Sequence, residues 1–261
     1  MATPHKYSID GEILEPGQAF LPLPDDAVFR GDGVFEVLRL YDGRPFAFEA
    51  HLDRMERSAE AIDLPLDRAA LEADAAGLIA EAQDDGLLRI VATRSGRRIL
   101  SLEELPDHAP TIALATVEYS PTVILNGVKS LSYAANMQAT RIAQAAGADE
   151  ALLVRPDGVV LEPPTSSIFW ATTEGRLRTP ALDAGVLDSI TRRKIVERLE
   201  VEEAEFQLDD LLNASEAFLA STTREVQPID RINGRTFEGP GPRTEGAMKA
   251  FARAREDDHR T

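Results

Sequence analysis

The sequence predicts a mixed α/β protein of the α+β kind that folds as two domains. Short apolar runs end in Asp-Gly or Asn-Gly pairs, which are typical of β-hairpins. Longer segments between them carry apolar residues at helical spacing. With 261 residues, the chain can bury a large core and is long enough for two domains of roughly 120 residues each.

Turn signals in the first half of the sequence predict where its strands begin and end. Asp10-Gly11 predicts a hairpin over residues 7–14, and Asp42-Gly43 turns one strand into the next. Helices are expected where apolar residues share one stripe. The first half is therefore predicted to hold strands at 34–41, 45–48, 87–93, 99–102 and 111–117, and helices at 51–62 and 67–83.

A connection between the domains is expected at residues 119–125, which include Pro121 and follow the last strand of the first half. The predicted domains are therefore a small N-terminal α/β domain at 1–118 and a larger C-terminal domain at 126–261. The second domain is expected to open with a short apolar strand that carries Lys129.

A helix is predicted after that strand, from near Tyr133 to Gly147, where glycine fits a left-handed helix end. A hairpin then joins residues 150–154 to 159–162. Lys129 and Glu162 are therefore expected to end neighbouring strands at one edge of a sheet. The remaining predicted elements are strands at 168–171, 177–179, 201–206 and 216–220, a hairpin around Asn233-Gly234, and helices from Ser189 (or Asp188), Leu208 and Arg243.

The composition argues against several functions. A formal net charge of −17 would repel nucleic acid, and it indicates a solvated acidic surface or salt adaptation. No apolar run approaches the roughly 18 residues of a membrane span. The chain has no cysteine and four histidines, a set that builds neither a disulfide framework nor a convincing metal site. The first residues lack an apolar signal core, so a cytoplasmic location is expected.

Lys129 differs from the other lysines in its surroundings. The sequence has four lysines: Lys6, Lys129, Lys194 and Lys249. Only Lys129 is flanked by the apolar residues Val128 and Leu131, where burial would lower the pKa of the amine and make it nucleophilic. The alternative is a lysine that extends its amine to water from the end of a strand.

A series of motifs runs in order along nearly the whole chain. They are R-G-D-G-V-F-E-V at 30–37, H-L-D-R-M-E-R-S-A at 51–59, K-S-L at 129–131, G-A-D-E-A-L-L at 147–153, E-P-P-T-S-S-I-F at 162–169, S-I-T-R-R at 189–193 and S-T-T-R-E-V-Q-P-I at 221–229. Together they resemble the class IV aminotransferases, the pyridoxal-phosphate enzymes of fold type IV. The resemblance implies two domains with the cofactor at their interface, the C-terminal domain as the main cofactor-binding unit, and a homodimer whose active site a neighbouring subunit completes.

The resemblance also assigns roles to residues. Lys129 would be the catalytic lysine that holds the cofactor covalently, and Glu162 would keep the pyridine nitrogen protonated. Leu187 would pack against the ring. The phosphate group would be held by Arg54 (with Arg57 as the fallback), Ile190, Thr191, Ser221 and Thr222, partly at a helix amino terminus.

Recognition of the substrate carboxylate is expected near the basic turn at 94–98. The candidates are Phe35, Glu36, Arg97, Arg98 and Thr223. This turn is shorter than in the resembling D-amino acid enzymes, lacks a histidine after its last arginine, and Phe35 stands where those enzymes often have tyrosine. The alternatives are a solvated turn for the arginines and a solvent-facing strand position for Glu36.

The resemblance implies a transaminase that moves an amino group from a D-amino acid to a 2-oxo acid such as 2-oxoglutarate or pyruvate. The sequence of the 221–229 motif is more similar to that of D-amino acid aminotransferases than to that of branched-chain aminotransferases. Aminodeoxychorismate lyase, which releases pyruvate, a branched-chain aminotransferase, and a transaminase of primary (R)-amines remain alternatives. A non-catalytic acidic binding protein on the same scaffold is a remote one.

Overall fold

The computed structural model of the protein describes residues 4–21, 23–82 and 84–260. The chain forms two compact units: unit 1 consists of Met1–Asp107 with Val128–Tyr133, and unit 2 of His108–Gly127 with Ala134–Thr261. Each unit is built around its own β-sheet. Within the described residues, no helix is long and apolar enough to cross a membrane, and the cellular location stays a prediction.

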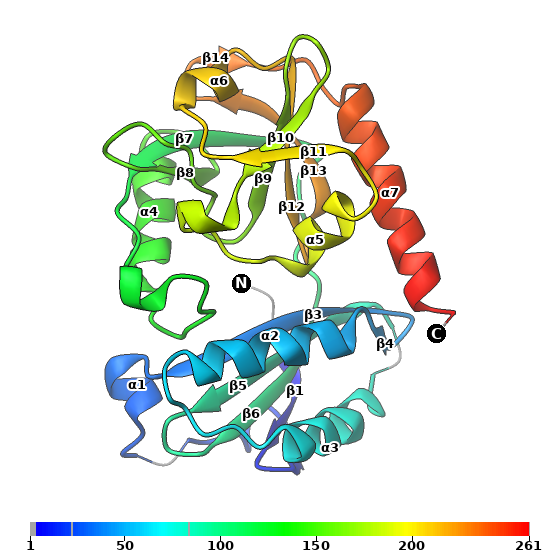
Figure 1. Ribbon diagram of the computed structural model, residues 1–261. Coiled ribbons are helices and arrows are strands. Elements are labelled where there is room, and N and C mark those ends of the chain that lie inside the picture. Colours follow the sequence, from blue (N-terminus) through cyan, green and yellow to red (C-terminus); the bar gives the residue numbers. More distant parts are fainter. Residues whose placement is uncertain (1–3, 22, 83, 261) are drawn as a thin grey trace. The chain divides into compact units, whose positions relative to one another are not determined.

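Unit 1 is a six-stranded antiparallel sheet in the order β2-β1-β6-β5-β3-β4, with helices α2 and α3 over one face (Figure 1). Leu52, Met55 and Ala59 of α2 form the expected buried stripe and pack against β3 side chains such as Leu38. Its elements are β1 (Pro4–Ile9), β2 (Glu12–Leu14), α1 (Asp26–Arg30), β3 (Gly33–Tyr41), β4 (Arg44–Pro45), α2 (Phe48–Glu60), α3 (Arg68–Ile79), β5 (Gly86–Thr93) and β6 (Arg98–Glu103).

Unit 2 contains an eight-stranded mixed sheet in the order β11-β10-β9-β12-β13-β7-β8, with β14 paired to β13. Its elements are β7 (Ile112–Glu118), η1 (Val123–Leu125), α4 (Ala134–Ala145), β8 (Glu150–Val154), β9 (Ser167–Ala171), β10 (Leu177–Pro180), η2 (Leu182–Ala184), α5 (Ile190–Val196), β11 (Val201–Ala204), α6 (Leu208–Leu212), β12 (Glu216–Ser221), β13 (Glu225–Ile232), β14 (Arg235–Thr236) and α7 (Pro242–Asp258).

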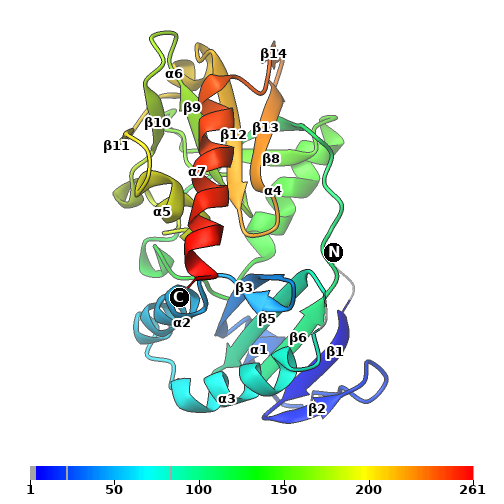
Figure 2. The same cartoon turned by 90° about the vertical axis from the view of Figure 1, so that its right-hand side faces the viewer.

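The central strands of this sheet are buried on both faces. Successive side chains of β9 point to opposite sides: Phe169 stacks on Phe218 with ring centroids 5.0 Å apart, whereas Trp170 meets Phe206 edge-on at 5.1 Å. Helices α5 and α7 pack against β12, and Figure 2 shows α7 running alongside β12 and β13. The ends of β9 and β12 are therefore held in a rigid frame.

Several predicted elements are confirmed, with bounds that shift by a few residues. The hairpin over 7–14, strand β8 and the Ser189 helix cap are present as expected, and α4 ends before Gly147. Helix α2 begins three residues earlier than residue 51. Helix α3 ends at Ile79; residue 83, its predicted end, lies outside the described residues. The short helix α1, capped by the Asp25 side chain, was not predicted.

The division of the chain differs from the predicted boundary at 118. Strand β7 belongs to unit 2, because it pairs in parallel with both β13 and β8 and its Leu114 lies in the core of that unit. Residues 119–125 also lie within unit 2. The chain then enters unit 1 for only six residues, Val128–Tyr133, where Val128 packs against the core, and returns to unit 2.

The predicted pairing of the Lys129 and Glu162 strands is wrong. Ser130 makes one isolated bridge to Val34, so the lysine segment extends the sheet of unit 1. Val159 and Val160 form isolated bridges rather than part of a strand, to Gln207 and to Val154 in unit 2. The two segments therefore join different sheets.

Candidate active site

The predicted site residues fall into two groups, one in each unit. Unit 1 carries Phe35, Glu36, Arg54, Arg97, Arg98 and Lys129. Unit 2 carries Glu162, Leu187, Ile190, Thr191, Ser221, Thr222 and Thr223. The geometry of each group is defined by the unit that holds it.

Lys129 is half-buried and is held through its main chain. Its carbonyl accepts a hydrogen bond from the Phe35 N–H at 3.0 Å, and its own N–H donates to the Ser58 hydroxyl of α2 at 3.2 Å. The Lys129 Nζ lies 4.4 Å from the centroid of the Phe35 ring. The amine therefore projects along an aromatic face, which attracts a cation and limits where the side chain can go.

A buried carboxylate lies beneath this segment. Glu36 is on the core face of β3, fully buried, and accepts two hydrogen bonds from Arg54, from Nε at 2.7 Å and from Nη2 at 2.6 Å. The Nδ1 of His51 lies 2.7 Å from the same carboxylate. Since an ionised carboxylate only accepts hydrogen bonds, Nδ1 of His51 carries the proton.

Opposing effects set the ionisation of these two groups. Burial raises the pKa of Glu36, but the charges of Arg54 and His51 and their hydrogen bonds outweigh it and lower that pKa to about 2. Burial lowers the pKa of His51 against the opposing attraction of Glu36, and the nearby cations of Arg54 and Lys129 lower it further. Glu36 is therefore an anion, and His51 favours the neutral form.

Glu36 is not the solvent-facing strand residue that the alternative interpretation described. Alternation along β3 puts it on the face that α2 covers, next to Val34 and Leu38. Arg54 uses two guanidinium nitrogens on this buried carboxylate. Its predicted role at the cofactor phosphate stays a prediction.

His51 and Ser58 were not singled out from the sequence. Both lie with Arg54 on one face of α2, at helical spacings of three and four residues. The spacing within the H-L-D-R-M-E-R-S-A motif could have identified them, since polar residues on the buried stripe of a helix need partners.

In unit 2, Glu162 has both carboxylate oxygens engaged. Oε1 accepts the Leu187 N–H at 2.7 Å, and Oε2 lies 3.3 Å from the Ser167 hydroxyl that donates to it. Glu162 and Leu187, which the resemblance assigns to the same cofactor ring, are thus in contact. Ser167 was not predicted, although it stands in the same E-P-P-T-S-S-I-F motif.

The predicted phosphate residues of unit 2 lie in the first turn of α5 and at the end of β12. Ser189 caps α5, its hydroxyl accepting from the Arg192 N–H at 3.4 Å, and the first-turn residues Ile190 and Thr191 are buried. Amide N–H groups in a first helical turn have no partner within the helix. Helix α5 contacts β12, which ends at Ser221.

The basic turn does not present its arginines freely. Arg97 pairs with Asp10, and Arg98 Nε bonds to Asp74 at 2.7 Å. Arg94 forms a third pair, with Asp32. The carboxylate-trap interpretation of Arg97 and Arg98 therefore has to compete with ion pairs inside unit 1.

Comparison with known proteins defines the class. The sequence model of the family described as amino-transferase class IV matches residues 33–232. The chain belongs to the class IV aminotransferases and is an enzyme of that class. This confirms the predicted family.

Three relatives carry the names of different activities. The chain is 32% identical to a putative branched-chain-amino-acid aminotransferase of Methanocaldococcus jannaschii over 259 residues, which is 89% of each chain. It is 30% identical to a D-alanine aminotransferase of Bacillus licheniformis, over 94% of this chain and 95% of that one. It is 31% identical to a bifunctional aminodeoxychorismate lyase / D-amino acid transaminase of Mycobacterium tuberculosis, over 91% and 93%.

The fold agrees with solved structures of such enzymes. The PLP-bound form of a hypothetical aminotransferase from Mycobacterium tuberculosis superposes with a TM-score of 0.87 at 27% identity, covering 97% of this chain and 99% of that one. The predicted fold type IV architecture is confirmed. The position of a cofactor between the units stays a prediction.

Proposed function

We propose that the chain is a pyridoxal-phosphate-dependent transaminase that moves an amino group from a D-amino acid to a 2-oxo acid such as 2-oxoglutarate or pyruvate. The observation that carries the proposal is Lys129, a half-buried amine whose backbone is bonded on one side to β3 and on the other to α2. An amine fixed in this way can serve as both nucleophile and proton carrier.

The donor set fits pyridoxal phosphate. Lys129 offers a primary amine for its aldehyde, and Glu162 offers a carboxylate for its pyridine nitrogen. The first-turn amides of α5 and the hydroxyls of Ser221 and Thr222 offer donors for its phosphate. When bound, the cofactor supplies an electron-accepting ring that stabilises negative charge at the substrate α-carbon.

Different residues of this chain would have different roles around that ring. Lys129 Nζ takes the proton from the substrate α-carbon and later returns one, acting as base and then as acid. Glu162, oriented by Leu187 and Ser167, holds a proton at the ring nitrogen. Leu187 packs on the ring, and Arg54, Ile190 and Thr191 assist at the phosphate. Phe35 and Thr223 would border the substrate, whereas the predicted role of Glu36 there is not proposed further, because its carboxylate is fully buried against Arg54 and His51.

Support for a D-amino acid donor comes from two sources. The relatives from Bacillus licheniformis and Mycobacterium tuberculosis are named for D-amino acid transamination. The S-T-T-x-E-V-x-P-I wording at 221–229 also resembles that group. The second candidate is aminodeoxychorismate lyase, which the bifunctional relative's name favours; a branched-chain aminotransferase is the third, on the name of the relative from Methanocaldococcus jannaschii.

The test is the absorption spectrum of the protein loaded with pyridoxal phosphate. D-alanine or D-glutamate should abolish the visible band, and 2-oxoglutarate should restore it, whereas L-leucine should do neither. A band that responds to L-leucine instead would favour the branched-chain activity. Release of pyruvate from aminodeoxychorismate without an amino acceptor would identify the lyase. A protein that binds no cofactor, or a Lys129→Ala protein with normal turnover, would refute the proposal.

A homodimer is proposed on an exposed apolar surface of unit 1. Phe20, Leu23 and Phe29, in and before α1, are 77%, 64% and 62% exposed. Large apolar side chains that are exposed close together in the sequence are candidates for an interaction surface. Light scattering should give twice the 28.5 kDa of one chain. Phe29→Asp should lower that mass, and a monomeric wild-type protein would contradict the proposal.

A further inference from the structure

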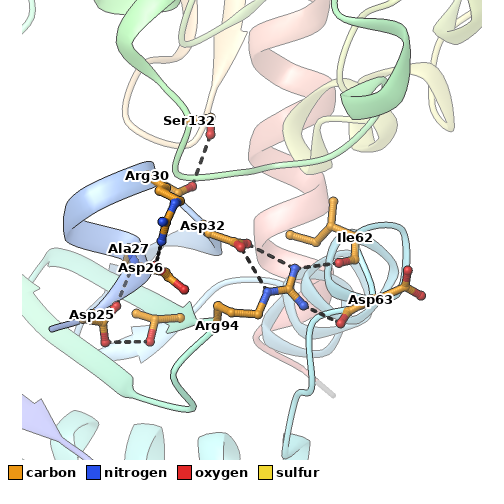
Figure 3. A network of polar contacts seen from close by, with 11 residues as sticks. Asp25, Asp26, Ala27, Arg30, Asp32, Ile62, Asp63, Arg94 and Ser132 are labelled. Carbon is orange, nitrogen blue, oxygen red and sulfur yellow. Dashed lines mark hydrogen bonds and ion pairs between the residues drawn. The ribbon is translucent and has the colours of Figure 1, made fainter.

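Arg94 directly follows β5 and is the centre of a polar network (Figure 3). Its Nε and Nη2 lie 3.1 and 3.2 Å from the two carboxylate oxygens of Asp32, in the loop before β3. The same guanidinium donates to the carbonyls of Ile62 and Asp63, at 2.7 and 2.5 Å, in the turn after α2. The Arg94 side chain therefore connects the residue before β3 to the turn after α2.

The first residue of β3 and the loop before it are bonded to the segment that carries Lys129. The Gly33 carbonyl accepts the Leu131 N–H at 2.9 Å, and the Gly31 carbonyl accepts the Ser132 hydroxyl at 3.2 Å. The contact is close: a Cβ on Gly33 would lie 2.6 Å from the Leu131 side chain. A shift of this loop is therefore passed on to residues 129–132.

Both backbone contacts of Lys129 come from the elements that Arg94 joins. The Phe35 N–H belongs to β3, and the Ser58 hydroxyl belongs to α2. The rest of the segment is held to β3 and to the loop before it, by the bridge between Ser130 and Val34 and by the hydrogen bonds of Leu131 and Ser132. Its position therefore depends on the spacing between β3 and α2.

We propose that Arg94 is a positioning residue for Lys129: its guanidinium holds the Asp32 loop and the Ile62–Asp63 turn at a fixed spacing and so fixes the amine. The role of the amine rests on the proposed function; the positioning of the segment does not. The ion pair is about a third exposed on both sides and by itself stabilises little. The planar fork, which reaches a carboxylate and two carbonyls at once, is what a lysine cannot replace.

The first experiment uses amide hydrogen exchange on the cofactor-free protein. Arg94→Ala should speed exchange of the Phe35 and Leu131 amides by about tenfold or more, while amides of α7 keep their wild-type rates. Arg89→Ala is the matched control. Arg89 also lies on β5, is 33% exposed and makes a bidentate pair, with Glu103, but it touches neither contact of Lys129. That variant should leave both amides as in wild type.

The second experiment follows the visible band of the cofactor-loaded protein through a pH titration. Arg94→Ala and Arg94→Lys should shift the midpoint by roughly half a pH unit or more, because the environment of the Lys129 amine changes. Arg89→Ala should not shift it. Arg94→Lys carries both experiments if Arg94→Ala does not fold.

Wild-type exchange at Phe35 and Leu131 together with a wild-type midpoint in the Arg94 variants would overturn the proposal. Equal acceleration of the α7 amides would overturn it too, since it would show a general loss of stability. If the wild-type protein takes up no cofactor, the proposed function fails, yet the exchange comparison still decides the role of Arg94.

Discussion

Arg54 and Glu36 form a buried two-point contact in unit 1, at 2.7 and 2.6 Å, and the carboxylate is fully excluded from water. Burying two charges is costly, and geometry this close is what offsets the cost. The pair joins α2 to β3, the same two elements that hold the Lys129 backbone. Its integrity therefore affects both stability and the site.

Glu36→Gln removes the negative charge and leaves the Arg54 cation buried beside a neutral amide. We expect the free energy of unfolding to fall by about 3 kcal/mol, as when one partner of a buried pair is lost. Urea unfolding at neutral pH measures this. Lys249→Ala, which removes an exposed lysine 4.0 Å from Glu245, is the control and should unfold close to wild type. Equal stability of the two variants would contradict the prediction.

Stability should fall as the pH is lowered, in two stages. The folded-state pKa of His51 is below its ordinary 6.5, so below that pH the unfolded chain binds a proton that the folded protein resists. Glu36 acts in the same direction from pH 4.5 down to about 2. His51→Gln keeps a donor for Glu36 and removes the first stage. Unfolding free energies at pH 7.5 and 5.5 should therefore differ less in this variant, and an unchanged difference would refute the assignment.

Glu162→Gln tests the proposed ring partner. The amide still offers an oxygen to the Leu187 N–H but no longer carries the charge that holds a proton at the pyridine nitrogen. We expect kcat to fall by about a hundredfold or more, with cofactor affinity changed by less than about tenfold. Glu174→Gln, at an exposed turn, serves as the control. Wild-type kcat in Glu162→Gln would remove the carboxylate from the chemistry.

Two glycine substitutions should have opposite effects. A Cβ on Gly33 would lie 2.6 Å from both the Ala92 carbonyl oxygen and the Leu131 side chain, so Gly33→Ala should destabilise the protein by about 1–3 kcal/mol. A Cβ on Gly77, within α3, would meet nothing within 4 Å. Gly77→Ala should therefore stabilise the protein by about 0.5–1 kcal/mol. Thermal unfolding of both variants decides, and the same sign for both would count against this packing.

Local signals in the sequence predicted local structure well. Ser189 caps α5 because its hydroxyl meets an amide three residues on, and Asn233-Gly234 makes the turn between β13 and β14. Motif residues that lie close in sequence also came out close in space, as Ser167 and Glu162 do. These features depend on interactions between residues that are only a few positions apart in the sequence.

Features that depend on distant segments were not predictable in the same way. The apolar run around Lys129 favours a strand, but only the partner, here Val34, decides which sheet it joins. The alternation in β3 defines two faces, yet the burial of Glu36 depends on α2 covering one of them and supplying Arg54. From the sequence, strand β7 was assigned to the first half. Its two parallel partners, β8 and β13, come later in the chain and place it in unit 2.

Residues Val128–Tyr133 belong to unit 1, although the residues on both sides of them belong to unit 2. This arrangement has a consequence for biosynthesis. Domains emerging from a ribosome usually fold in the order in which they are made. Here the first unit lacks one of its segments until residue 133 has left the exit tunnel, and by then the β7 strand of the second unit has already been made. A nascent chain stopped at residue 107 would hold Arg54 and Glu36 but not Lys129, because Lys129 belongs to the second, separate stretch of unit 1.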